Sequence, residues 1–341
     1  MKSKSPRSRA TGRVTLADVA ALAKVSPITV SRALRGERAV ASDLTERVKA
    51  AADKLGYTPD PAARALASRH SDHVAVLIPM LSNNLFVDVL ESIQKTLRQA
   101  GYQTLIGITH YDTREEEQLL REQLQHRPAG ILVTGLDRSD AARTLIEKSG
   151  IPCVHMMELA QSPEVNSVGF SQTQAAIALT EHLLQRGRQR IAFAAAQLDP
   201  RTMQRLDGWR KALKAAKRYD KALTYTNKSA SSMALGGQML AEILKNDPEV
   251  DAIFFCNDDL AQGALLAAQR LKIKVPQQLA IAGFNDLTGS DLVGPGLTTI
   301  RTPRAAIGQA ASQMLLALMR HEEVPTHSVD VGYELMVRGS T

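Results

Sequence analysis

One short stretch near the N-terminus carries side chains that suit contacts with DNA bases. Ile28 offers an apolar contact to a thymine methyl group, and Arg32 can make a bidentate pair with guanine. In a helix that starts after Ser26, these two residues and Thr29 would face base edges from the N-terminal end of the helix. Contacts with phosphates are expected from Ser31, Arg35 and Arg38. The stretch therefore predicts sequence-specific contact with duplex DNA.

A second set of polar side chains is spread over the rest of the chain, each after a short apolar run. Neutral amides, a guanidinium and an aromatic ring suit a small polyhydroxylated ligand. The expected ligand-binding residues are Asn83, Asn84, Phe86, His110, Glu158, Arg205, Asn257 and Asn285. Asn and Asp after strands also serve as helix caps and turn formers, which is the better interpretation for any single one of them. The set as a whole favours a ligand.

The DNA-contacting stretch has the signals of three short helices that could position it. Thr15 with Asp18 forms a capping-box-like start, and Ser26 followed by Pro27 starts a second helix two residues after the first ends. Ser42 is expected to cap a third helix, which ends at Gly56. Residues 14–58 therefore predict a helix-turn-helix domain; the alternative is a small helical subdomain with a solvated basic surface.

The positive charge of the chain is concentrated in this N-terminal part. Residues 1–70 contain fourteen Lys and Arg against six Asp and Glu, a net charge of +8, while the whole chain carries +7. The other 271 residues therefore carry −1. A basic arm over residues 1–13 precedes the helices. This asymmetry favours nucleic acid as the partner.

Residues 59–71 read as a hinge between the helices and the rest of the chain. Pro59 and Pro61 stop the third helix, and residues 62–68 favour a helix that is too short to hold alone in water. Leu66 could insert into a minor groove as an apolar wedge. A plain linker whose Leu66 packs on the body is an equal alternative.

After Ser71 short apolar runs alternate with helical stretches, and this alternation occurs in two successive sets. This pattern predicts two α/β lobes with parallel sheets that are covered on both faces. We expect one lobe over 72–170 and 301–328 and the other over 171–300 and 329–341. Ligands of parallel sheets bind at the carboxyl ends of the strands, where the polar set lies.

Several classes of protein are disfavoured. No stretch approaches about 18 uncharged apolar residues, and the basic N-terminus lacks the apolar core of an export signal, which disfavours a membrane protein and a transport-type binding protein. The two cysteines, Cys153 and Cys256, are far apart, which fits a reduced cytoplasmic setting without a metal site. Common catalytic and phosphate-binding motifs are missing, so we expect neither an enzyme nor a cofactor.

The chain resembles the LacI/GalR family of regulators over nearly its whole length. The matching residues in the head and hinge are Val14, Thr15, Leu16, Asp18, Val19, Ala20, Val25, Ser26, Thr29, Val30, Ser31, Arg32, Gly56, Tyr57, Pro59, Ala65, Leu66 and Ala67. Matching motifs in the body include Phe254–Asp258, Ala282–Phe284 and Leu297–Ile300. The resemblance implies a type I periplasmic-binding-protein-like body and a homodimer on a pseudo-palindromic operator.

The resemblance also implies roles for individual residues. Leu66 matches the hinge leucine that enters the minor groove, and Arg205 matches the arginine that grips the ligand. Ser231 lies where several members stack an aromatic ring on the ligand, which favours a small and very polar effector. The complete set of expected DNA contacts is Thr15, Ser26, Ile28, Thr29, Ser31, Arg32, Arg35, Ala63 and Leu66.

The likeness is strongest to repressors of gluconate and 2-ketogluconate use, through Gly101–Thr104, Val168–Phe170 and Asn257–Ala261. It implies a cytoplasmic, effector-controlled repressor whose ligand is a sugar acid. A neutral sugar as the effector, or a DNA-binding protein without a ligand, remains the alternative. We expect effector binding to move the lobes and thereby disturb the paired hinges, and we expect a dimer without a tetramerising helix.

Overall fold

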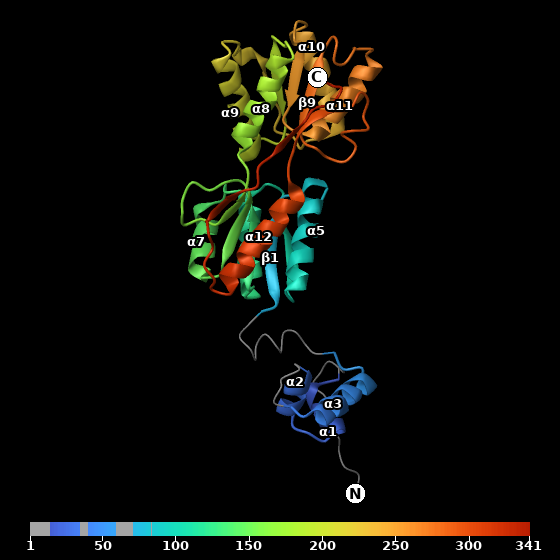
Figure 1. The fold of residues 1–341 in the computed structure, drawn as a ribbon, viewed down its shortest axis with the longest axis vertical. Coiled ribbons are helices and arrows are strands. Elements are labelled where there is room, and N and C mark those ends of the chain that lie inside the picture. The colour runs from blue at the N-terminus through green and yellow to red at the C-terminus, as the bar shows by residue number, and fades with distance from the viewer. Residues whose placement is uncertain (1–13, 35–39, 59–70, 83) are drawn as a thin grey trace. The chain divides into compact units, whose positions relative to one another are not determined.

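The computed structural model describes residues 14–34, 40–58, 71–82 and 84–341. It divides the chain into two compact units, Met1–His70 and Ser71–Thr341, here called the head and the body. Figure 1 shows the helices of the head and the two sheet-containing lobes of the body. In the part of the chain that is described, no helix combines the length and the apolar character needed to cross a membrane.

The head is a three-helix unit of α1 (Leu16–Ala23), α2 (Pro27–Leu34) and α3 (Ser42–Leu55). Val19, Val30 and Val48, one from each helix, are fully buried against one another and against small alanines. The chain leaves α1 through Lys24 in the left-handed conformation, at φ 54°, and re-enters a helix at Pro27. The predicted helix-turn-helix arrangement is confirmed.

Local hydrogen bonds define where the head helices begin. Thr15 and Asp18 form the predicted capping box, with the Thr15 backbone N–H donating to the Asp18 carboxylate at 2.8 Å. The Ser26 hydroxyl oxygen accepts from the Thr29 backbone N–H at 3.1 Å. The predicted cap at Ser42 is wrong: Ser42 is already the first helical residue, Ala41 precedes it, and no side chain among the described residues caps α3. A hydroxyl inside the first turn is no longer in the flanking N-cap position from which a side chain accepts.

The body contains eight α-helices among the described residues and two six-stranded sheets. The helices are α5 (Asn84–Gln99), α6 (Thr113–Gln125), α7 (Asp140–Ser149), α8 (Gln172–Gln185), α9 (Pro200–Ala215), α10 (Met233–Asn246), α11 (Asp258–Arg270) and α12 (Arg304–Met319), with one short 3-10 turn at Lys221–Leu223. The strands are β1 (His73–Ile78), β2 (Gln103–Ile108), β3 (Gly130–Thr134), β4 (Cys153–Met157), β5 (Ser167–Gly169), β6 (Ile191–Ala195), β7 (Thr224–Thr226), β8 (Ala252–Phe255), β9 (Ala280–Asn285), β10 (Thr298–Arg301), β11 (Ser328–Asp330) and β12 (Glu334–Met336).

Each sheet belongs to one lobe. The first has the order β11-β5-β4-β3-β1-β2 and the second the order β12-β10-β9-β8-β6-β7. Every pairing among the described strands is parallel except β10 with β12. Parallel sheets are covered on both faces, and central strands such as β3 are accordingly buried along their whole length. The predicted α/β fold with two parallel-dominated sheets is confirmed.

The chain passes between the lobes three times. It leaves the first lobe between β5 and α8, returns between β10 and α12, and crosses again between β11 and β12. The boundary expected between residues 328 and 329 falls inside β11, which pairs with β5 of the first lobe, so the third crossing lies at 331–333. A three-residue edge strand has too short a pattern to be recognised from its sequence.

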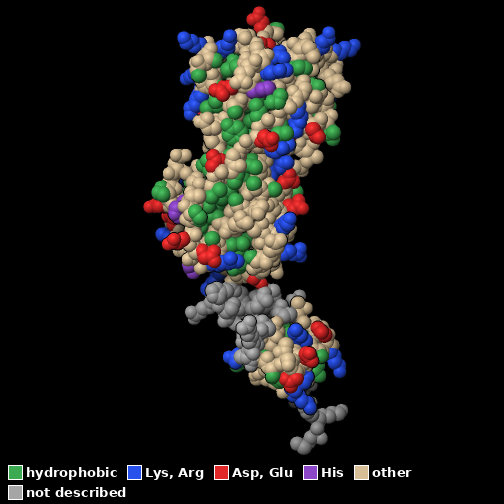
Figure 2. Space-filling model, viewed as in Figure 1, with side chains coloured by type: hydrophobic (Ala, Val, Ile, Leu, Met, Phe, Trp, Pro, Cys, Tyr) green, Lys and Arg blue, Asp and Glu red, His purple; other side chains and the backbone are tan. Residues whose placement is uncertain are grey.

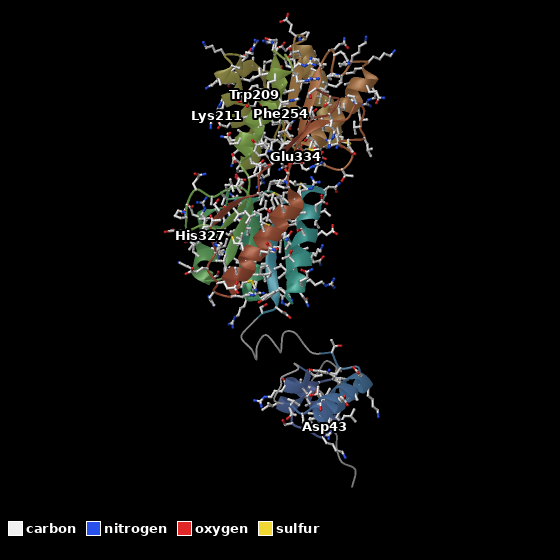
Figure 3. All side chains as sticks on the ribbon, viewed as in Figure 1. Asp43, Trp209, Lys211, Phe254, His327 and Glu334 are labelled. Atoms are coloured by element: carbon white, nitrogen blue, oxygen red, sulfur yellow. The ribbon has the colours of Figure 1, made fainter. Side chains whose placement is uncertain are left out.

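A cluster of buried aromatic rings packs in the core of the second lobe. The Phe193 ring centre lies 5.7 Å from that of Trp209 and 5.2 Å from that of Phe254, and all three side chains are fully buried. Figure 3 labels Trp209 and Phe254 inside this lobe. Gly208 of α9 has no room for a Cβ atom because the backbone carbonyl of Thr173 in α8 lies against it. The two helices therefore pack directly against each other at this point.

Candidate functional site

The N-terminal half of α2 presents an outward face. The Ile28 side chain is 66% exposed and Arg32 is exposed, whereas Val30 and Ala33 are buried in the head core. The Thr29 hydroxyl is hydrogen-bonded to that of Ser26 at 2.8 Å. The exposed Ile28 side chain is therefore available for an apolar contact with a partner.

The remaining predicted DNA contacts are distributed as follows. Thr15 serves as the cap of α1, with its hydroxyl donating to Asp18 at 2.7 Å, and Ser31 is half-buried. Arg35, Ala63 and Leu66 lie outside the described residues. Described head residues include five Lys and Arg against four Asp and Glu, so most of the positive excess is carried by residues outside that part. Figure 2 accordingly shows acidic and basic side chains next to one another on the visible face of the head.

The body contains a cavity of about 220 Å³ that is lined by residues of both lobes. Most of the lining follows the carboxyl ends of strands of both sheets, as parallel sheets predict. The lining residues are Met80, Ser82, Leu85, Phe86, Tyr111, Gln197, Asp199, Arg201, Thr202, Arg205, Ser231, Ser232, Asn257, Asp259 and Asn285.

Arg205 is the most informative group in this cavity. Its side chain reaches in from α9 and the residue is only 6% exposed. Its Nε donates to the Gln172 side-chain oxygen at 2.9 Å, and Nη1 donates to the Cys256 carbonyl at 2.6 Å. The guanidinium carbon lies 3.9 Å from the centre of the Phe284 ring. Burial lowers the pKa of Arg205, and no described carboxylate lies within 4 Å of it.

Arg201, one turn earlier on α9, is neutralised by acidic groups instead. Its guanidinium lies 3.3 Å from an Asp199 oxygen and 3.6 Å from a Glu158 oxygen. Burial lowers the pKa of Arg201, but Asp199 and Glu158 outweigh burial and hold the pKa above its ordinary range. Asp199 also accepts from the first backbone N–H groups of α9, so its charge is already engaged. Among the described residues Arg205, in contrast, has no carboxylate within ion-pair distance, although the charge of Asp199 acts on it from farther away and favours its charged form.

Neutral donors and acceptors complete the cavity. Asn257 caps α11 through its side-chain oxygen, which accepts from Leu260 at 3.1 Å, while its amide nitrogen donates to the Ser231 hydroxyl at 2.6 Å. The Asn285 side-chain oxygen accepts from the Thr302 hydroxyl at 3.1 Å. Asn257 thus caps α11 through its side-chain oxygen and also lines the cavity, so the capping and ligand-binding interpretations are compatible.

The structure brings together five of the nine predicted effector-binding residues. Those that line the cavity are Phe86, Arg205, Ser231, Asn257 and Asn285. Asn83 lies outside the described residues, and Asn84 is exposed at the start of α5. His110 is exposed and its ring turns to Glu115 at 2.9 Å. Glu158 is buried behind Arg201, where Gln204 donates to it at 2.6 Å, and burial raises its pKa.

Sequence reasoning missed several lining residues. Arg201 and Thr202 lie at the start of α9, which faces the cavity, close in sequence to Arg205. Their position on this helix could have identified them as lining residues. Tyr111 was not recognisable, because φ 60° at this residue turns the chain after β2 and brings its ring towards Arg201. No group of three or more His, Cys, Asp or Glu among the described residues is arranged to hold a metal ion.

Comparison with known proteins finds a family match in the head and another in the body. Residues 15–60 match the family of bacterial regulatory proteins of the lacI type, and residues 180–341 match a periplasmic binding protein-like domain. A regulator named GntR from Pseudomonas aeruginosa is 53% identical over 334 residues, which cover 98% of this chain and 97% of that protein. The chain belongs to the LacI family.

Solved structures of this family extend the comparison to the fold. The transcription regulator GntR from Chromobacterium violaceum is 48% identical and has a TM-score of 0.77 over 79% of this chain and 98% of its own. A lac repressor dimer bound to operator and an anti-inducer is 26% identical, with a TM-score of 0.86 over 96% of this chain and 99% of its own. As a LacI-family member, the protein is a DNA-binding transcription regulator and not an enzyme.

Proposed function

We propose that this LacI-family regulator is a homodimeric repressor of a pseudo-palindromic operator, controlled by a sugar acid such as gluconate or 2-ketogluconate. A protein of this kind works on DNA in the bacterial cytoplasm. Residues 14–58 bind the operator, residues 59–71 act as the hinge, and the body binds the effector and dimerises. The relatives named GntR, and the operator-bound dimer of the lac repressor, support this assignment.

One observation carries the choice of an acid. Arg205 places a buried positive charge at the cavity, and its protein partners are a neutral amide oxygen and a backbone carbonyl. A buried charge is expensive unless it is paired, and a guanidinium pairs best with a carboxylate in a bidentate arrangement. The amides and hydroxyls of Asn257, Asn285 and Ser231 then suit the hydroxyls of a sugar chain.

A neutral sugar is the second candidate, favoured by the acidic groups of the same cavity. Asp199 and Asp259 line it and could accept hydrogen bonds from sugar hydroxyls. The two candidates differ in whether the ligand must carry a carboxylate.

Calorimetric titration of the full chain with matched ligands tests the proposal. D-gluconate and sorbitol have the same number of carbon atoms, but only gluconate carries a carboxylate, and D-glucose tests a cyclic neutral sugar. We expect binding of gluconate or 2-ketogluconate, and weaker binding of sorbitol and glucose by at least tenfold. Equal or stronger binding of the neutral ligands would show that the acid assignment is incorrect.

The regulatory part is tested on a duplex that the protein itself selects from a random library. We expect the selected site to be a pseudo-palindrome bound by two chains, with affinity that falls as salt rises. Addition of the bound sugar acid should change the operator dissociation constant by about 5–150-fold, the range of ordinary allosteric coupling. An unchanged constant at saturating ligand would exclude effector control.

A further inference from the structure

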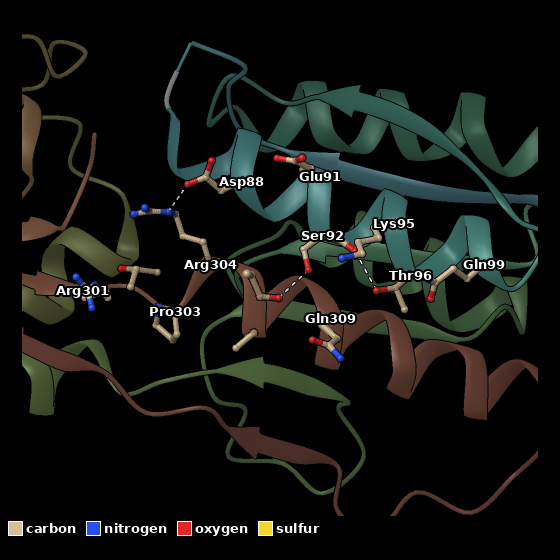
Figure 4. Close-up of a pocket in the computed structure, with 13 residues that line it drawn as sticks. Asp88, Glu91, Ser92, Lys95, Thr96, Gln99, Arg301, Pro303, Arg304 and Gln309 are labelled. Atoms are coloured by element: carbon tan, nitrogen blue, oxygen red, sulfur yellow. Dashed lines mark hydrogen bonds and ion pairs between the residues drawn. The ribbon is translucent and has the colours of Figure 1, made fainter. Parts of the chain in front are cut away.

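Arg304 joins the two lobes beside the effector cavity without lining it. It is the first residue of α12, directly after the chain has returned from β10 to the first lobe. Its Nε donates to a carboxylate oxygen of Asp88 in α5 at 2.6 Å. Its Nη1 donates to the backbone carbonyls of Asn285 and Asp286, at 2.7 Å and 3.1 Å, where β9 of the second lobe ends. Figure 4 shows Arg304 and Asp88 pointing towards each other at one end of a groove of about 640 Å³.

Both sides of this bridge belong to walls of the cavity. Asn285 lines the cavity directly, and Asp286 is its neighbour in the chain. On the other side, Phe86 lines the cavity from the same first turns of α5 that carry Asp88. A ligand that moves either wall therefore changes the distance that the Arg304 guanidinium has to span.

The corner that Arg304 holds has an unusual backbone. Asn285 and Asp286 have φ values of 116° and 52°, a region that residues other than glycine rarely adopt. Such conformations persist when the surroundings over-determine them, and here one guanidinium donates to both carbonyls. Loss of these two donors removes a restraint from the corner and from its contact with α5 at the same time.

We propose that Arg304 is a positioning residue that couples the effector cavity to the helix pair α5 and α12 of the first lobe. The planar guanidinium can donate hydrogen bonds to a carboxylate on one side and to two carbonyls on the other, because its N–H groups are held in a rigid fork. The regulatory consequence rests on the proposed function, whereas the bridge between α5 and the Asn285 corner does not depend on the identity of the effector.

Arg301 provides a matched control in the same groove. It is also an arginine with two acidic partners, Asp286 at 2.8 Å and Glu334 at 2.9 Å. Both partners lie in the second lobe, so Arg301 supports the corner from one side only. Asp88→Asn is the complementary change, because it weakens the contact with α5 and leaves Arg304 on the carbonyls.

Hydrogen exchange of the ligand-free protein tests the bridge itself. We expect Arg304→Met to raise exchange in both peptides 84–90 and 284–288, Arg301→Met to raise it only in 284–288, and Asp88→Asn only in 84–90. If Arg304→Met leaves 84–90 at the wild-type rate, the bridge does not hold α5 and the inference is overturned. A melting curve for each variant verifies folding. If Arg304→Met does not fold, exchange of peptide 84–90 in Asp88→Asn decides whether the bridge holds α5.

Operator titrations with and without saturating D-gluconate test the coupling. We expect Arg304→Met to shrink the ratio of the two operator dissociation constants at least fivefold, while the gluconate affinity of the operator-free protein stays within threefold of wild type. Arg304→Lys should behave like Arg304→Met, since an ammonium lacks the fork; a full rescue by lysine would refute the geometric role. If the wild-type protein does not respond to gluconate, the proposed effector is wrong and the exchange experiment alone decides the role of Arg304.

Discussion

Substitution of Arg205 by methionine is the sharpest test of the effector site. The change removes the buried guanidinium while keeping an unbranched side chain that extends about as far as the arginine Nε. It leaves the Gln172 side-chain oxygen and the Cys256 carbonyl without their donor. That loss is present with and without ligand, so it largely cancels from a binding measurement although it lowers the free energy of unfolding.

The magnitude follows from the donors that remain. A guanidinium has five N–H groups, and Arg205 uses two of them in the hydrogen bonds to Gln172 and Cys256. Three remain, which is enough for a bidentate carboxylate. Hydrogen bonds to charged groups contribute about 1.5–3 kcal/mol each. Loss of two such bonds should weaken gluconate binding by at least about 3 kcal/mol, or roughly 100-fold at 1.4 kcal/mol per tenfold change.

The assay is a cycle of two proteins and two ligands in a calorimeter. Gluconate and sorbitol are titrated into wild-type protein and into Arg205→Met, and operator affinity without ligand is measured as a control. We expect the variant to lose about 100-fold for gluconate, to change less than about fivefold for sorbitol, and to keep its operator affinity. A loss that is equal for both ligands, or below fivefold for gluconate, would refute the pairing of Arg205 with a carboxylate.

Four further predictions concern the head, the hinge and a buried acid. Thr15→Ala removes the capping box and should lower the free energy of unfolding of the head by about 1 kcal/mol in a denaturant melt. Arg32→Ala should weaken binding of the selected operator by about 1–3 kcal/mol in an anisotropy titration, with a smaller effect on random duplex. Leu66→Ala should weaken operator binding and leave gluconate affinity unchanged; equal operator affinity would exclude the minor-groove wedge. Burial raises the pKa of Asp258 to about 6. Between about pH 4 and 6 the native state therefore holds a proton on this group that the unfolded state has lost. The free energy of unfolding of the wild type should fall, relative to that of Asp258→Asn, as pH rises through this window. His155, whose pKa burial lowers to about 4, acts in the opposite direction, which is why the comparison with the variant is needed.

Local sequence signals were sufficient for most of the elements. The start of α1 follows from Thr15 and Asp18 because a capping box is made by residues three apart. The strands β1 and β3 follow from unbroken apolar runs, since parallel strands covered on both faces have no polar side. The cap at Ser42 was wrong because the choice of the first helical residue depends on a backbone angle at Ala41 that side-chain type does not specify.

The sequence by itself determined the class of the protein: a basic helical head, a two-lobed α/β body, and polar residues placed after the strands. Periodicity, capping and charge are local properties, so they can be read one segment at a time. The tertiary structure alone decided which polar groups meet. It turned His110 away to Glu115, buried Glu158 behind Arg201, and brought Arg304 to the carbonyl of Asn285. These contacts join residues that are distant in the chain or depend on single backbone angles, and no periodic pattern encodes them.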